Sequence, residues 1–182
     1  ADQKVVYDAI RGGPRAKVAN SGASKPGPLG GPFNVMLRSP GVGNIVQALG
    51  GEIRFKSSIP NKLNELAIMV TARYWTSQYE WFAHCKLALD AGLNPAIAKD
   101  VAENRRPANM DADEAMIYDF SRELHETKAV SDANYNRVLD RFGERGVFDL
   151  IAVNGYYAFV SMVLNVDRSP VPGGKTPLPV LK

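Results

Sequence analysis

Cysteine and histidine are both scarce in this chain, which has one cysteine, Cys85, and two histidines, His84 and His125. A single cysteine excludes an intrachain disulfide framework, and it also excludes any CxxC redox or zinc motif. The two histidines lie far apart in the sequence, so they do not by themselves predict a dedicated metal site. We expect His125, between Glu123 and Glu126 on an amphipathic helix, to be exposed and inert.

An excess of either charge is also lacking, because 22 lysines and arginines face 19 aspartates and glutamates and leave a net charge of +3. The basic residues form no cluster, so nucleic acid is not an expected partner. No run approaches the roughly 18 continuous apolar residues of a membrane span, so we expect a soluble protein without a membrane partner. We expect it in the cytoplasm, or in the periplasm if Ala1 follows a cleaved signal peptide.

Sustained alternation of polar and apolar residues, the pattern of half-buried strands, is absent. Apolar residues instead recur every three or four positions, with helix starts at Ser39-Pro40, Asn94-Pro95 and Ser131-Asp132. The chain length fits one domain, residues 1–182. The sequence therefore predicts a single-domain, all-α bundle of about seven or eight helices. The expected helices are 2–11, 40–55 with a bend at Gly50-Gly51, 61–75, 77–91, 95–106, 111–128, 131–145 and 147–166.

Glycine and proline concentrate near the two ends of the chain, in residues 12–32 and 167–182. Such residues interrupt regular structure, so we predict a helical core at about 33–165 with extended N- and C-terminal arms. About twenty residues without regular structure is long for a compact domain. The arms therefore wrap the body, cover a site or contact a neighbouring subunit, with a frayed tail as the alternative.

The most apolar part of the chain contains two acids and a histidine. In a helix over residues 77–91, Glu80 and His84 lie four residues apart and share one face. Glu65 lies nineteen residues before His84, and a tight turn brings its carboxylate to the same imidazole. A surface ion pair has the same spacing, but the surrounding residues are apolar and favour burial. Buried carboxylates need charged or hydrogen-bonding partners, or a functional role. We therefore predict a buried cluster of Glu65, His84 and Glu80.

Three motifs in this region, NELA at 64–67, YEWFAH at 79–84 and ALDAGL at 88–93, resemble the carboxymuconolactone decarboxylase family, which includes the alkylhydroperoxidase D proteins. The resemblance extends more loosely over residues 33–165, and it implies an all-α, alkylhydroperoxidase D-like fold and a homo-oligomer, either a dimer, a trimer or a hexamer. In the peroxidase branch, two cysteines lie seven and four residues before the histidine. Ser77 and Glu80 occupy those positions here, so dithiol peroxidase activity is not expected.

The resemblance then implies the decarboxylase branch, in which a cofactor-free and metal-free lyase acts on a small carboxylated lactone or a related product of aromatic compound degradation. Loss of carbon dioxide leaves an enolate that must be protonated. His84 is the expected general acid and base, with Glu80 and Glu65 orienting it and holding its pKa near the working pH.

Other side chains are candidates for binding the substrate. Arg54 is a possible anchor for a substrate carboxylate, with a solvated surface charge as the alternative. Trp81 and Tyr156 are candidate walls of the pocket, and Tyr157 and Asn154 place further polar groups on the same apolar helix as Tyr156. Ordinary core packing is the alternative for all four.

Three other functions stay open. The protein could be a non-catalytic, metabolite-binding family member, which a closed cluster without an adjoining cavity would favour. It could be a redox protein that uses Cys85 alone, which requires an accessible thiol of lowered pKa. A divalent metal site on Glu65, Glu80 and His84 is the third, since carboxylates and imidazole both bind such ions.

Overall fold

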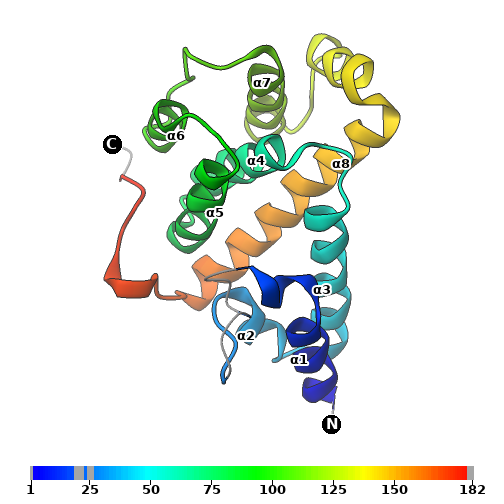
Figure 1. Ribbon diagram of the computed structural model, residues 1–182, viewed down its shortest axis with the longest axis vertical. Helices are drawn as coiled ribbons and strands as arrows, with labels where there is room; N and C mark the ends of the chain where they lie inside the picture. The colour runs from blue at the N-terminus through cyan, green and yellow to red at the C-terminus, as the bar shows by residue number, and fades with distance from the viewer. Residues whose placement is uncertain (1, 19–22, 24–26, 180–182) are drawn as a thin grey trace.

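The computed structural model describes residues 2–18, 23 and 27–179. In these residues the protein has eight α-helices and no strand, so the predicted all-α bundle is confirmed (Figure 1). The helices are α1 (Asp2–Gly12), α2 (Pro32–Met36), α3 (Pro40–Phe55), α4 (Asn61–Tyr74), α5 (Gln78–Asp90), α6 (Pro95–Ala102), α7 (Ala112–Thr127) and α8 (Asp132–Asp167). Two 3-10 turns, η1 (Pro14–Lys17) and η2 (Pro172–Gly174), lie in the predicted arms.

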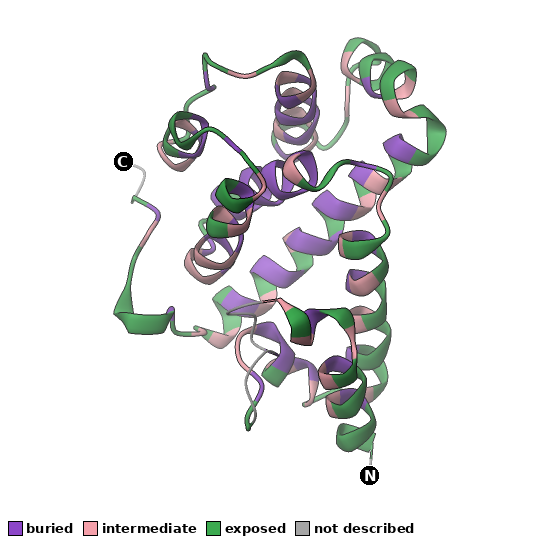
Figure 2. Ribbon diagram, viewed as in Figure 1, coloured by how far each residue is buried: buried purple, intermediate pink, exposed green. Residues whose placement is uncertain are grey.

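Helix α4 is the centre of the bundle, because every residue from Leu63 to Arg73 is buried (Figure 2). Helices α5, α7 and α8 pack around it. On one side, α4, α7 and α8 share the largest apolar core with the end of α3, and on the other side α4, α5 and α6 share a second core. Polar residues of α4 are therefore enclosed, and each of them needs a partner inside the protein.

Helix α8 runs diagonally through the molecule, between α4 to α7 on one side and α1 to α3 on the other (Figure 1). The predicted break at Gly146 is wrong, because the helix instead kinks at Gly143, whose φ of 68° lies in the left-handed region. By length and composition alone, helix α8 could also cross a membrane, although polar residues interrupt its apolar stretch. Half of its most apolar stretch is buried against the other helices, as in the core helix of a bundle.

The N-terminal part of the chain packs against α8 and α3 as a smaller third core. Its members are Val6, Ile10, Ala23, Leu29, Phe33 and Met36. Helix α3 continues through Gly50 and Gly51 without the predicted bend. A Cβ atom at Gly50 would lie 2.1 Å from the hydroxyl of Tyr156, so this glycine allows α8 to approach α3 closely.

The C-terminal tail folds back toward α5 and α6 (Figure 1). The side chain of Gln78 donates to the carbonyl oxygen of Leu178 at 3.0 Å and accepts from its N–H at 2.9 Å. The guanidinium of Arg73 donates to the carbonyl oxygen of Pro179 at 2.9 Å. Leu178 is buried in the second core. These contacts argue against a frayed tail through residue 179, and the predicted arm's last residues, 180–182, lie outside the described part.

Candidate active site

His84 on α5 contacts both predicted carboxylates. Its Nδ1 lies 2.6 Å from Glu65 Oε2, and its Nε2 lies 3.0 Å from Glu80 Oε1. Glu80 comes from the preceding turn of α5, whereas Glu65 comes from α4, to which a short turn joins α5. The three residues are 5% exposed or less. The predicted contacts are thus confirmed, and the interpretation as a surface ion pair is wrong.

The two carboxylates keep the imidazole of His84 protonated. Burial alone would lower the pKa of His84, but the negative charges of Glu65 and Glu80 outweigh burial and raise this pKa to about 9. Both ring nitrogens therefore carry a hydrogen at neutral pH, and each faces a carboxylate acceptor. With this raised pKa, His84 is mainly a proton donor at neutral pH.

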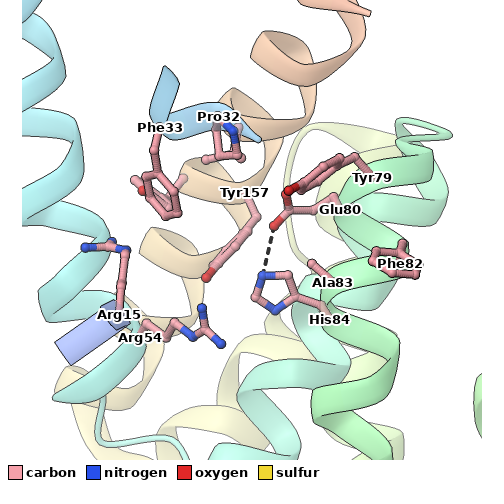
Figure 3. A pocket seen from close by; sticks show the side chains of 12 residues that line it. Arg15, Pro32, Phe33, Arg54, Tyr79, Glu80, Phe82, Ala83, His84 and Tyr157 are labelled. Carbon is pink, nitrogen blue, oxygen red and sulfur yellow. Dashed lines mark ion pairs between the residues drawn. The ribbon is translucent and has the colours of Figure 1, made fainter. Parts of the chain in front are cut away.

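A cavity of about 60 Å³ adjoins the cluster (Figure 3). This volume has room for about four water molecules, or for a small organic molecule in their place. Glu80 and His84 line the cavity, whereas Glu65 lies outside the lining and contacts the imidazole from behind. The other lining residues are Arg15, Pro32, Phe33, Arg54, Tyr79, Phe82, Ala83, Tyr156, Tyr157 and Val160.

Arg54 and Tyr157 add two polar groups to the cavity wall. The Nη2 atom of Arg54 lies 3.9 Å from Glu65 Oε1, so this arginine also balances the charge of Glu65. The ring of Tyr157 meets that of His84 edge-on, with centroids 4.9 Å apart. Burial raises the pKa of Tyr157 well above its usual value, so its hydroxyl remains a hydrogen-bond donor. A guanidinium, an imidazolium and a phenol therefore converge on one small cavity.

Of the predicted pocket walls, Tyr156 lines the cavity and Trp81 does not. Trp81 is buried in the second core between α4, α5 and α6, because α5 has apolar neighbours on more than one side. Sequence reasoning missed Arg15 and Phe33, which the N-terminal segment brings to the cavity. The only feature of the sequence that indicated these two residues was the predicted N-terminal arm, for which covering a site was one alternative.

The second histidine is buried too, so the prediction of an exposed His125 is wrong. Its Nε2 lies 2.9 Å from Thr71 Oγ1, which donates to Asn154 Oδ1 at 3.1 Å. Asn154 in turn donates to Ser121 Oγ at 3.1 Å, so it lies in this network rather than at the cavity. Burial lowers the pKa of His125 to about 4, although Asn154 partly opposes that shift. His125 is neutral at pH 7 and links α4, α7 and α8.

The geometry gives little support to thiol or metal chemistry. Cys85 packs against the second core, and burial raises the pKa of its thiol, whereas a reactive cysteine needs the opposite shift. Within residues 2–18, 23 and 27–179, no three His, Cys, Asp or Glu side chains are grouped as metal ligands. Both nitrogens of His84 already face carboxylates. The arrangement therefore favours proton transfer.

No family model, no curated protein and no solved structure matches this chain. The resemblance to the carboxymuconolactone decarboxylase family therefore rests on the three motifs around Glu65 and His84. Any function proposed for the chain therefore depends on the geometry of the site.

Proposed function

We propose that the protein is a cofactor-free carboxy-lyase that acts on a small carboxylated lactone or a related ring-cleavage acid. The observation that carries this proposal is a buried imidazolium, His84, held between two carboxylates at the wall of a cavity that also contains two arginines. A proton donor beside a cationic wall suits a reaction in which a carbanion forms and is then protonated.

The reaction breaks the bond between a ring carbon and its carboxylate. The electron pair of that bond enters an enolate, and carbon dioxide leaves as a neutral molecule. Arg54 and Tyr157 can stabilise the charge that develops on the enolate oxygen. The proton passes from Nε2 of His84 by way of Glu80, which contacts this nitrogen and lines the cavity. His84 then regains a proton from water, and no oxidant or reductant is needed.

A non-catalytic, metabolite-binding protein is the second candidate function. The cavity is small, and Pro32 and Phe33 of α2 are part of its lining, which favours close contact with a bound ligand. An open cavity beside the cluster favours catalysis, since a purely structural polar network has no need of one. Measurement of turnover separates the two.

Replacing His84 with glutamine is expected to lower the turnover of an accepted substrate by about 10²–10⁴-fold, the usual contribution of general acid–base catalysis. Glutamine keeps a polar side chain between Glu65 and Glu80, but it has no proton to transfer. The measurement is a mass-spectrometric scan for loss of carbon dioxide across a panel of carboxylated lactones and ring-cleavage acids.

The matched control is Cys85→Ser, which changes the next residue and leaves the acid–histidine contacts in place. This variant is expected to keep the wild-type rate, and loss of its turnover would favour thiol chemistry. Equal turnover by wild type and His84→Gln would contradict the lyase proposal. Binding of panel compounds without turnover by wild type would favour the second candidate.

We also propose that the chain forms a homo-oligomer through an apolar face on α3 and α8. Val42 of α3 and Phe159 of α8 line one groove, and at the other end of α3 Arg145 donates to the carbonyl oxygen of Lys56 at 3.0 Å. The two helices therefore lie side by side and antiparallel. The exposed apolar side chains of this α3–α8 face are Val42, Ile45, Leu49, Phe148, Ile151, Phe159, Met162 and Val166.

The area of the α3–α8 face matches what a dimer requires. Its side chains are between 38% and 84% exposed, and together they present roughly 800 Å² of surface, which is close to one partner's share of a standard interface. Typical monomers have smaller apolar patches. A second copy supplies an equal apolar area, and two-fold symmetry is the commonest arrangement of such copies.

The double variant Ile45→Glu with Phe148→Glu is expected to be monomeric, because it buries two carboxylates on each side of the interface. Light scattering after size-exclusion chromatography measures the mass of the wild type and of the variant. Leu89→Glu on α5 is the control, since Leu89 is exposed outside the α3–α8 face. A monomeric wild type at micromolar concentration would contradict this assembly, and binding to lipid vesicles would assign the face to a membrane.

A further inference from the structure

We propose that Arg15, in the 3-10 turn η1 of the N-terminal segment, binds the carboxylate of the ligand and makes the cavity selective for a small, flat monoanion. The inference deepens the proposed function, because it assumes that the cavity beside His84 is the substrate site. It assigns ligand recognition to a residue outside the region of the three motifs.

Arg15 is the only buried residue of the N-terminal turn η1. It is 5% exposed, and its guanidinium carbon lies 5.5 Å from the centre of the Phe33 ring. Its Nη1 donates to the carbonyl oxygen of Gln47 on α3 at 2.8 Å. Burying an arginine costs free energy unless its N–H groups are hydrogen-bonded. These contacts hold the guanidinium in one place at the cavity wall, where a planar, two-pronged donor fits a carboxylate.

The backbone of α3 leaves space for this arginine. A Cβ atom at Gly50 would lie 2.5 Å from Nη2 of Arg15 and 2.1 Å from the hydroxyl of Tyr156. Burial raises the pKa of Tyr156, and a hydrogen bond from Arg15 opposes that rise, so the two side chains are in contact. Arg15 and Tyr156 thus form a polar corner that only a glycine at this position of α3 permits.

The charges around the cavity favour a single anionic group. Arg15, Arg54 and protonated His84 supply three positive charges, while Glu65 and Glu80 supply two negative ones. Arg54 lies 3.9 Å from Glu65, whereas Arg15 lines the cavity from the N-terminal turn, with its guanidinium beside the Phe33 ring. The rings of Phe33 and Tyr157 add flat apolar surfaces. A small ring with one carboxylate matches this combination in charge, size and polarity.

The experiment titrates the full-length protein with 2-furoate, a five-membered ring monocarboxylate, and with the neutral 2-furamide as a matched probe. Binding is followed by calorimetry and by the NMR signals of the His84 ring. We expect 2-furoate to bind wild type at least tenfold more tightly than 2-furamide. Arg15→Met is expected to weaken 2-furoate at least tenfold, because it removes charge-assisted hydrogen bonds, and to leave 2-furamide nearly unchanged.

Lys17→Met is the control, because it removes an exposed positive charge from the same turn, and it should keep the wild-type affinity within twofold. Arg15→Lys keeps the positive charge but lacks the planar, two-pronged guanidinium, so its affinity for 2-furoate is expected to fall several-fold. This variant replaces Arg15→Met in the experiment if Arg15→Met does not fold. Equal affinity in wild type and both Arg15 variants would overturn the inference, and so would no preference of wild type for 2-furoate over 2-furamide.

Failure of this inference is distinct from failure of the proposed function. Loss of carbon dioxide that depends on His84 but is unaffected by Arg15→Met would overturn the role of Arg15 and leave the lyase in place. Binding of 2-furoate that depends on Arg15, without turnover of any compound in the panel, would support the anion site and reject the lyase.

Discussion

The two histidines are expected to titrate far apart, His84 near pH 9 and His125 near pH 4. Both are buried, so the difference arises from their neighbours. His84 has the carboxylates of Glu65 and Glu80, whereas His125 contacts the uncharged Thr71 and Asn154 and has the positive charge of Lys128 nearby, which further lowers its pKa. NMR titration of the two imidazole rings measures both pKa values in one sample, and the variant His125→Gln assigns the signals.

Glu65→Gln is expected to lower the pKa of His84 by about 1–3 units, because one of its two charged neighbours becomes neutral. In this variant only the charge of Glu80 raises the pKa of His84, while burial still lowers it. The control is Glu52→Gln on α3, which removes an exposed carboxylate and should leave the titration of His84 unchanged. Titration of His84 near 6.5 in wild type would contradict the placement of two negative charges beside its imidazole, and it would also remove the basis for a proton donor at neutral pH.

The same shifts predict how folding stability depends on pH. The raised pKa of His84 favours the folded state fully below pH 6.5, and that contribution, about 3 kcal/mol, is lost as the pH rises through 9. The lowered pKa of His125 acts in the opposite direction, because the folded state loses stability as the pH falls from 6.5 toward 4. Urea unfolding across this range should therefore show greatest stability near pH 6.5, with His84→Gln flattening the alkaline side.

The acid–histidine cluster could be predicted because it depends on local geometry. Glu80 lies four positions before His84 on one helix, and Glu65 lies on the helix joined to it by a short turn. The partners follow from helical periodicity and from one tight connection. The pKa of His84 could not be predicted in the same way, since it depends on how completely water is excluded from both carboxylates.

The remainder of the site depends on the path of the whole chain. Arg15 reaches the cavity because η1 packs against α3, and no periodic pattern in residues 12–32 indicates that contact. His125 was predicted to be exposed from its acidic neighbours, which point in other directions on a helix. A better signal was available in Ser121 and Ile117, which lie four and eight residues before it and are fully buried.

Gly50→Ala is expected to reduce both stability and ligand binding, although alanine normally favours a helix over glycine by about 1 kcal/mol. The added Cβ would lie 2.1 Å from the Tyr156 hydroxyl and 2.5 Å from Nη2 of Arg15. Both side chains are buried, so relief of these contacts must move groups that line the cavity. Overpacking of this kind costs about 1–3 kcal/mol, and urea unfolding of the wild type and the variant measures it.

Gly51→Ala is the matched control, because it places the same methyl group one residue further along α3. Its Cβ would meet only Nη1 of Arg15, at an ordinary contact distance of 3.6 Å. We expect this variant to gain up to about 1 kcal/mol from helix propensity and to bind 2-furoate as wild type does. Equal stability of the two alanine variants would mean that Tyr156 and Arg15 withdraw without cost. The polar corner would then be loose, and a loose guanidinium could not select a flat monoanion. A clear deficit in Gly50→Ala alone, in both stability and affinity, would locate ligand recognition where α3, α8 and the N-terminal turn meet.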